Sequence, residues 1–315
     1  AVAQIPRLLE SLASTGSIIS LRMFLSCRSS DRALADIIGG ELLEKTECFQ
    51  NLRELTLDGS HLVAVNLAGR SKMLKILGKR LECLRFVGNT PKGIFEVIEE
   101  LCPNLRRLRL DRSNEGVDYS HMPFLEDMRL ERSMHLPTAF SYESLRLFSF
   151  SYYHYFGVDR IERLITNLAM QLKRPLEGLD LEIPGVFVNE TLCFCAEHLR
   201  DLQSLTIRSS HSDGVISPGT IQSLAQACPN LRQLKMKGKS TSPIIFSPSA
   251  LQELGFVHKL DELFLVLNDK HLDNIERLLS SSSFPLKVIM WERRRWVSAH
   301  IWRNAQLKLA DIQCR

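Results

Sequence analysis

Residues 101–113 read LCPNLRRLRLDRS, and residues 227–239 read ACPNLRQLKMKGK. The two stretches lie far apart in the chain, yet both contain Cys-Pro-Asn-Leu followed by apolar residues three and five positions after that Leu. The last two apolar residues alternate with polar ones, which is the spacing of side chains on one face of a short β-strand. A chain that repeats such a stretch is expected to repeat the structure that the stretch forms.

The Leu-x-x-Leu-x-Leu pattern, with other apolar residues allowed, recurs along the chain. Clear copies start at residues 52, 81, 105, 125, 145, 176, 202, 231 and 260, and weaker copies start at residues 18 and 286. Most intervals between these starts fall between 20 and 29 residues, which is the length of leucine-rich repeats. We therefore expect about eleven repeats.

Helical spacing lies between several of the expected strands. Apolar residues three and four apart predict helices over residues 34–42, 94–101, 161–168 and 272–279. Within Cys-Pro-Asn, the Cys is expected to be buried at the end of a helix, and the Pro cannot continue that helix. Parallel strands pack about 4.8 Å apart, whereas helices need roughly 8–10 Å. The helix side of the stacked repeats must therefore be longer than the strand side, so the array is expected to curve. The predicted fold is an α/β leucine-rich repeat solenoid, a curved horseshoe with parallel strands on its concave face and helices and loops on its convex face.

The ends and the centre of the array differ from its other repeats. Residues 1–17 are predicted to form an N-terminal helical cap, residues 18–291 the repeat array, and residues 292–315 a C-terminal cap. In the centre, successive copies start only 20 residues apart, at 105, 125 and 145. This interval predicts repeats backed by loops instead of helices.

Residues 224–236, LAQACPNLRQLKM, carry a more specific resemblance. They resemble the cysteine-containing leucine-rich repeat of F-box proteins, and residues 98–110 match most of the same positions. The resemblance implies a substrate receptor of an SCF-type ubiquitin ligase, with the repeats holding the substrate. It also implies an adaptor protein as a partner only if an F-box lies upstream of residue 1, because residues 1–17 are too short to contain one. The second Cys of the family's repeat is absent after the strands.

Composition favours a soluble interaction protein. The net charge of +4 is too small to indicate nucleic-acid binding. No long apolar run indicates a membrane span, and the first residues lack the features of a signal peptide. Eight cysteines without a C-x-x-C pair favour a reducing compartment, the cytoplasm or the nucleus. We expect a monomer.

Polar residues alternate with the buried residues of the expected strands, and they are the candidate partner-binding residues. On the concave face these candidates are Arg85, Arg107, Arg109, Asp127 and Arg129. Mixed charge suits a protein substrate, because complementary charge sets specificity and association rate. A solvated strand face whose charges balance one another would show the same residues.

An aromatic run, FSFSYYHYF, spans residues 148–156. Phe148 and Phe150 are expected in the core, whereas Tyr152, Tyr153 and Tyr155 follow the strand and are candidate partner-binding residues. Exposed tyrosines are frequent binding anchors. The alternative is that these rings cover the central repeats as part of the structure.

The remaining motifs point to structure more than to chemistry. WERRRWVSAHIW, residues 291–302, fits a terminal cap better than a surface for anionic lipid or nucleic acid. Cys193, Cys195 and His198 lack a fourth zinc ligand nearby, so no metal site is predicted. No catalytic motif or cofactor fingerprint occurs, so we expect neither an enzyme nor a cofactor.

Two functions remain open. The first is the substrate-recognition domain of an SCF-type ubiquitin ligase receptor, which binds a protein on the concave face. The second is a leucine-rich repeat scaffold, or an inhibitor-type binding protein, with no role in ubiquitin transfer.

Overall fold

The computed structural model divides the chain into two compact units. Unit 1 comprises residues 1–145 and 171–174, and unit 2 comprises residues 146–170 and 175–315. The structure describes residues 18–24, 49–58, 71, 74–88, 93–112, 118–119, 122–133, 139–140, 143–152, 157–183, 187–209, 215–238, 244–254, 259–266, 287–292, 295–300 and 309–311.

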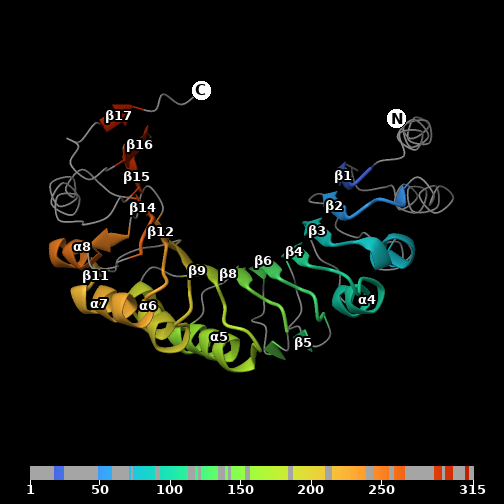
Figure 1. Cartoon of the computed structure of the whole chain (residues 1–315), viewed down its shortest axis with the longest axis horizontal. Helices are drawn as coiled ribbons and strands as arrows, with labels where there is room; N and C mark the ends of the chain where they lie inside the picture. Colours follow the sequence, from blue (N-terminus) through green and yellow to red (C-terminus); the bar gives the residue numbers. More distant parts are fainter. Residues whose placement is uncertain are drawn as a thin grey trace. The chain divides into compact units, whose positions relative to one another are not determined.

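Unit 1 contains a parallel sheet whose strands follow chain order (Figure 1). Its strands are β1 (Ser20–Phe24), β2 (Glu54–Asp58), β3 (Cys83–Val87), β4 (Arg107–Asp111) and β6 (Asp127–Ser133). The short helix η3 (Gly78–Arg80) precedes β3, and helix α4 (Ile94–Leu101) precedes β4. Leu55, Leu84, Leu108 and Met128 share one register level and are all buried.

Unit 2 repeats the same arrangement with more helices. Its parallel strands are β8 (Leu147–Tyr152), β9 (Gly178–Ile183), β10 (Ser204–Ser209), β12 (Gln233–Lys237), β14 (Glu262–Val266) and β15 (Lys287–Glu292). Its helices are α5 (Val158–Gln171), α6 (Val188–His198), α7 (Pro218–Ala227) and α8 (Pro248–Leu254). These helices lie on one side of the sheet (Figure 1). Two short strands, β11 (Val215–Ile216) and β13 (Ile245–Phe246), pair beside them.

The predicted fold class, α/β leucine-rich repeat, is confirmed in both units. The first and second apolar residues of the clear sequence copies are buried from Leu52 to Leu263. Neighbouring strands align these leucines level with one another, as in β9, β10 and β12, where Leu179, Leu205 and Leu234 are partners. The helices predicted over residues 94–101 and 161–168 are α4 and part of α5. Those predicted over residues 34–42 and 272–279 lie outside the described residues.

The junction before each strand has one geometry in many repeats. The backbone N–H of the first motif Leu donates to the carbonyl three residues earlier, at 3.1–3.2 Å. The acceptors are the carbonyls of Phe49, Gly78, Cys102, Met122, Leu199 and Cys228. All six residues are buried, so Cys in the Cys-Pro-Asn stretch is one of several residues that fill this position.

A second backbone contact joins each repeat to the next. One carbonyl of a repeat accepts two successive N–H groups from the following repeat, at 2.7–3.0 Å. In unit 1 the accepting carbonyls belong to Ile19, Arg53, Glu82 and Arg106. In unit 2 those of Arg146, Glu177 and Gln203 do the same. Because only backbone atoms take part, the residue type at this position is free to vary.

The described parts of the segments between the central strands agree with the loop-backed repeats that the short intervals predict. Between β4 and residue 145, the described residues contain no helix. The short strands β5 (Asp118–Tyr119) and β7 (Ala139–Phe140) pair in parallel in this part of unit 1.

The two ends of the chain leave the cap predictions open. Residues 1–17 lie outside the described residues. At the other end, β15 pairs with β16 (Arg295–His300) and β16 with β17 (Leu309–Asp311), both antiparallel. The C-terminal cap over residues 292–315 therefore stays a prediction. Of the described helices, none has the length and apolar character needed to cross a bilayer.

Candidate partner-binding surface

The strands of unit 1 expose one face, defined here as the open face of unit 1. It consists of the side chains that alternate with the buried leucines of β1, β2, β3, β4 and β6. One register level across these strands is occupied almost entirely by arginine. In order, its residues are Arg22, Thr56, Arg85, Arg109 and Arg129. We call this level the arginine row.

Neighbouring arginines in this row are held close by the backbone. Adjacent strands lie about 4.8 Å apart, and like charges directly opposite one another repel. The levels before and after the row supply carboxylates. Arg107 Nη2 lies 2.5 Å from Glu54 Oε1, and Arg129 Nη2 lies 3.0 Å from Asp127 Oδ2. The first pair lies within the level before the row, where Glu54 on β2 and Arg107 on β4 share one register position, and the second pair joins that level to the row.

In the other two ion pairs, the carboxylates stand at the level after the arginine row. Arg22 Nη2 lies 3.8 Å from Asp58 Oδ2, and Arg109 donates to Glu131 Oε1. On the open face of unit 1, four of the five arginines thus pair one to one with four carboxylates. The fifth carboxylate of the face, Asp111, is buried level with Glu131 and pairs with Arg132. Arg85 is the arginine that makes no ion pair with any residue that the structure describes.

One atom of the Arg85 side chain is shielded from solvent, although the residue as a whole is only half-buried. Its Nε is buried and has no hydrogen-bond partner among the described residues. Burial lowers the pKa of the Arg85 guanidinium, and the nearby charge of Arg109 lowers it further. A buried N–H without an acceptor costs about 1–3 kcal/mol, so this side chain is held in place at a cost to folding.

The ends of β4 and β6 are organised by a buried carboxylate. Asp111 Oδ1 accepts from Arg132 Nε at 2.7 Å, Asp111 Oδ2 pairs with Arg132 Nη2, and Oδ2 accepts from Gly88 N at 3.2 Å. Gly88 follows β3, Arg112 follows β4 and Arg132 is the last residue but one of β6, and their φ angles are 98°, 52° and 50°. The left-handed region is unfavourable for arginine, which indicates that this edge is constrained by the repeat and by Asp111.

The open face of unit 2 is defined in the same way from β8, β9, β10 and β12. Its central level reads Ser149, Asp180, Thr206 and Lys235. Arg208 Nε lies 2.9 Å from Asp180 Oδ1, and Arg208 Nη1 lies 3.9 Å from Glu182 Oε2. One arginine is therefore shared between two carboxylates. Because the central level contains a serine, an aspartate, a threonine and a lysine, this face has no row of like charges in register.

The structure brings together the five charged candidates predicted from the sequence. Arg85, Arg107, Arg109, Asp127 and Arg129 all lie on the open face of unit 1. Tyr152 is the last residue of β8, whereas Tyr153 and Tyr155 lie outside the described residues. The tyrosine site stays a prediction. Phe148 and Phe150 are buried, and their rings stack with centroids 6.3 Å apart.

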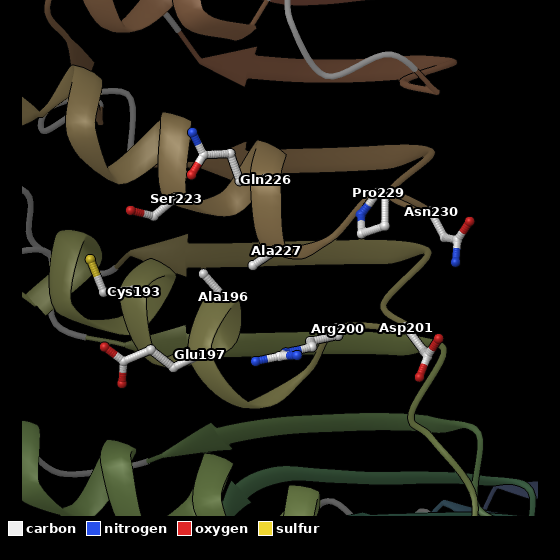
Figure 2. A pocket seen from close by; sticks show the side chains of 10 residues that line it. All are labelled: Cys193, Ala196, Glu197, Arg200, Asp201, Ser223, Gln226, Ala227, Pro229 and Asn230. Atoms are coloured by element: carbon white, nitrogen blue, oxygen red, sulfur yellow. The ribbon is translucent and has the colours of Figure 1, made fainter.

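Sequence reasoning did not find a groove on the helix side of unit 2. It has a volume of about 630 Å³ and lies between α6 and α7 and the turns that follow them (Figure 2). Ala196 and Ala227 leave space there, and Glu197, Arg200 and Asp201 line it (Figure 2). It contains no aromatic side chain among its lining residues.

The other motifs are structural where they are described. Cys195 is fully buried, and the described part of the chain contains no group of three side chains that could hold a metal ion. Asn189 begins a glycosylation sequon, but its side chain joins two helices. Asn189 Nδ2 donates to Val215 O at 2.9 Å, and Oδ1 accepts from Ser217 N and Thr220 Oγ1, both at 3.1 Å.

Comparisons with known proteins give matches among solved structures alone, at low identity. No family model matches the chain, and no curated protein matches it. Among solved structures, one match is to the crystal structure of the yeast Rad7 and Elc1 complex, with 14% identity over 92% of this chain and 76% of that chain, and a TM-score of 0.45. Another is the leucine-rich repeat-containing protein LegL7 from Legionella pneumophila, with 12% identity over 90% of this chain and 87% of that chain, and a TM-score of 0.36.

Proposed function

We propose that this chain is a protein-interaction module whose partner binds the open face of unit 1. The observation that carries the proposal is the arginine row, which places Arg22, Arg85, Arg109 and Arg129 at one register level of a parallel sheet. The sheet fixes the backbone positions from which these side chains extend, so a partner meets charges at a defined spacing. The charges give specificity and a fast association rate.

The partner is proposed to be a protein and not a nucleic acid. Four carboxylates flank the arginine row, from Glu54 to Glu131. A continuous phosphate backbone would lie against these carboxylates as well as against the arginines, which would oppose binding. A protein can present basic groups to the carboxylates and acidic groups to the arginines.

The biological role that we propose is substrate recognition within an SCF-type ubiquitin ligase receptor. It is supported by the resemblance of the Cys-Pro-Asn-Leu repeats, in which Cys102 and Cys228 are both buried at helix ends. In this role the chain binds its substrate without a catalytic step of its own, as a monomer in the cytoplasm or nucleus. The second candidate is a scaffold or inhibitor-type binding protein, which the same surface would serve equally well.

Site-specific photocrosslinking tests the binding surface. A photoreactive residue replaces the exposed Arg129 on the open face, and in a matched control it replaces the exposed Glu96 on α4. We expect a defined protein to be crosslinked in cells from position 129 and not from position 96. Equal crosslinking from both positions, or none from position 129, would refute the proposed surface.

The ligase role needs a separate test. The full-length protein is expressed in cells and captured, and the SCF adaptor is detected in the captured material. We expect the adaptor to be present, and the crosslinked partner to accumulate when the receptor is depleted. Absence of the adaptor together with an unchanged partner level would favour the scaffold or inhibitor role.

A further inference from the structure

Arg85 differs from the other four arginines of its face because each of those four pairs with a carboxylate. The positions of its neighbours explain the difference. Its register neighbours are Thr56 on β2 and Arg109 on β4. The acidic groups that act on it most strongly are Glu131 and Asp58. Glu131 pairs with Arg109 and Asp58 pairs with Arg22. Arg85 is therefore a cation between occupied ion pairs, with no counter-ion among the described residues.

A guanidinium in this position has unused binding capacity. It carries five N–H donors in a planar arrangement that matches the two oxygens of a carboxylate or phosphate. Its Nε lies buried without an acceptor, so part of the dehydration that binding requires has already occurred during folding. An oxyanion that reaches this guanidinium would gain a charge-assisted hydrogen bond at a reduced desolvation cost.

The flanking carboxylates limit what can deliver that oxyanion. Asp58 and Glu131 lie at the next register level, and Glu54 and Asp127 at the previous one. A single negative group fits between them, whereas a chain of negative groups would meet like charge on both sides. This excludes polyanions and favours a protein segment with one acidic group at the contact.

We infer that Arg85 is the docking point for one oxyanion side chain of the protein partner, either a carboxylate or a phosphorylated hydroxyl. The inference rests on the proposed function and specifies the chemistry of its partner. Arg109 lies next to Arg85 in the row, so a phosphate with its larger charge could contact both guanidinium groups. A carboxylate would contact Arg85 alone.

The groove between α6 and α7 lacks an unpartnered buried charge of this kind. Glu197 and Asp201 line it together with Arg200, so the charges there are mixed. No buried side-chain donor or acceptor without a partner occurs among its lining residues.

The test uses the intact chain and three small probes. N-acetyl-phosphoserine amide, N-acetyl-glutamate amide and N-acetyl-glutamine amide are titrated while the arginine Nε–Hε signals are followed by NMR. We expect the Arg85 signal to move with at least one of the two anionic probes and not with the glutamine probe. If the phosphoserine probe acts at the lower concentration, the partner's oxyanion is a phosphorylated hydroxyl. If the glutamate probe does, it is a carboxylate. If neither anion moves the Arg85 signal, the inference is wrong.

Two variants separate binding from folding. Arg85→Gln removes the charge at the site, and Arg163→Gln removes an exposed charge on α5 that pairs with Asp159. Followed through the backbone amide signals of Thr56 and Arg109, which flank position 85 on the neighbouring strands, Arg85→Gln should weaken anion binding at least about ten-fold, and Arg163→Gln should not change it. Arg85→Gln should also keep its melting temperature, whereas a clear fall would show a structural role and overturn the inference.

The partner found by crosslinking distinguishes this inference from the proposed function. If position 129 crosslinks a protein and Arg85→Gln leaves its yield unchanged, the binding surface stands and the docking role of Arg85 falls. If no protein is crosslinked, the proposed function falls, and the titration still decides whether Arg85 binds an oxyanion.

Discussion

The open faces of units 1 and 2 have the same backbone and different chemistry. Both are parallel ladders in which every second side chain is buried. Unit 1 aligns arginines in register and leaves Arg85 without a counter-ion among its described neighbours. Unit 2 places Ser149 and Thr206 at its central level, and its Arg208 is shared by Asp180 and Glu182.

This difference separates two sets of positions within the same repeat. The buried set is almost uniform, since the core of both units consists mainly of leucine. The exposed set is free to change, because its side chains do not contribute to the core. A face whose charged groups pair with one another, as in unit 2, needs no further partner in solvent. A face that keeps a charged group without an ion pair, as in unit 1, is a candidate for ligand binding.

The largest expected effect should be the same in both units. Leu108→Ala in β4 and Leu205→Ala in β10 each remove a buried side chain from the same motif position. Each should lower the free energy of unfolding by about 2–5 kcal/mol, because a cavity replaces packed atoms. Urea denaturation followed by circular dichroism measures the loss. A large loss in one unit and none in the other would show that the two cores are not equivalent.

The helix side should respond unequally to added methyl groups. A Cβ at Gly78 would lie 2.4 Å from Leu101 O and 2.9 Å from Cys102 Sγ, whereas nothing lies within 4 Å of a Cβ at Gly219. Gly78→Ala in unit 1 should cost about 1–3 kcal/mol through overpacking. Gly219→Ala in unit 2 should gain about 0.4–1 kcal/mol by restricting the unfolded chain. Equal changes in melting temperature would contradict this packing.

The two open faces should respond oppositely to loss of an arginine. Arg208→Gln leaves Asp180 and Glu182 without their shared cation, which should cost up to about 1 kcal/mol. High salt should reduce this cost by screening. Arg85→Gln removes a charge that no described residue neutralises, so stability should stay unchanged or rise. Thermal melts at low and high salt measure both variants, and a larger loss for Arg85→Gln would reverse the comparison.

The smallest expected effect depends on pH and lies at the strand edge of unit 2. Arg146 donates to both Glu177 oxygens, at 2.7 and 2.6 Å, which lowers the pKa of the Glu177 carboxyl below its usual value. A lowered folded-state pKa gives stability above the unfolded pKa of about 4.3, and this stability is lost as pH falls through the folded value.

Arg146→Gln should therefore destabilise the chain by less than about 1 kcal/mol at neutral pH. The difference from the unchanged chain should disappear in acid, which urea denaturation at several pH values can measure. Arg106→Gln is the control in unit 1, where Arg106 makes one contact of 2.9 Å with Glu126. A difference for Arg146→Gln that persists in acid would show that its contribution is packing and not charge.

Much of the fold could be predicted from the sequence because it depends on the period of buried residues. Leu105, Leu108 and Leu110 illustrate this, since their spacing alone places them in the core. The lack of a helix among the described residues of the central repeats agrees with the interval length in the same way. These features are local, so a short stretch of sequence contains the information.

The candidate site was predictable only in part. The sequence identifies Arg85, Arg107 and Arg109 as exposed strand residues, but it does not say which carboxylate pairs with which arginine. Arg107 pairs with Glu54, which is 53 residues away in the chain and belongs to β2 and not to the adjacent β3. The isolation of Arg85 follows from these long-range pairings. The contacts of Asn189 with the next repeat were missed for the same reason.

The carbonyl that accepts two N–H groups from the next repeat belongs in turn to Ile19, Arg53, Glu82 and Arg106 in unit 1. The coupling between these repeats is therefore indifferent to side-chain identity. Whole repeats of unit 1 can be duplicated or deleted by genetic rearrangement without the need for compensating substitutions at this contact. The array can thus change the number of its exposed charges as evolution adds or removes modules, while the hydrogen bonds that hold adjacent modules together remain the same.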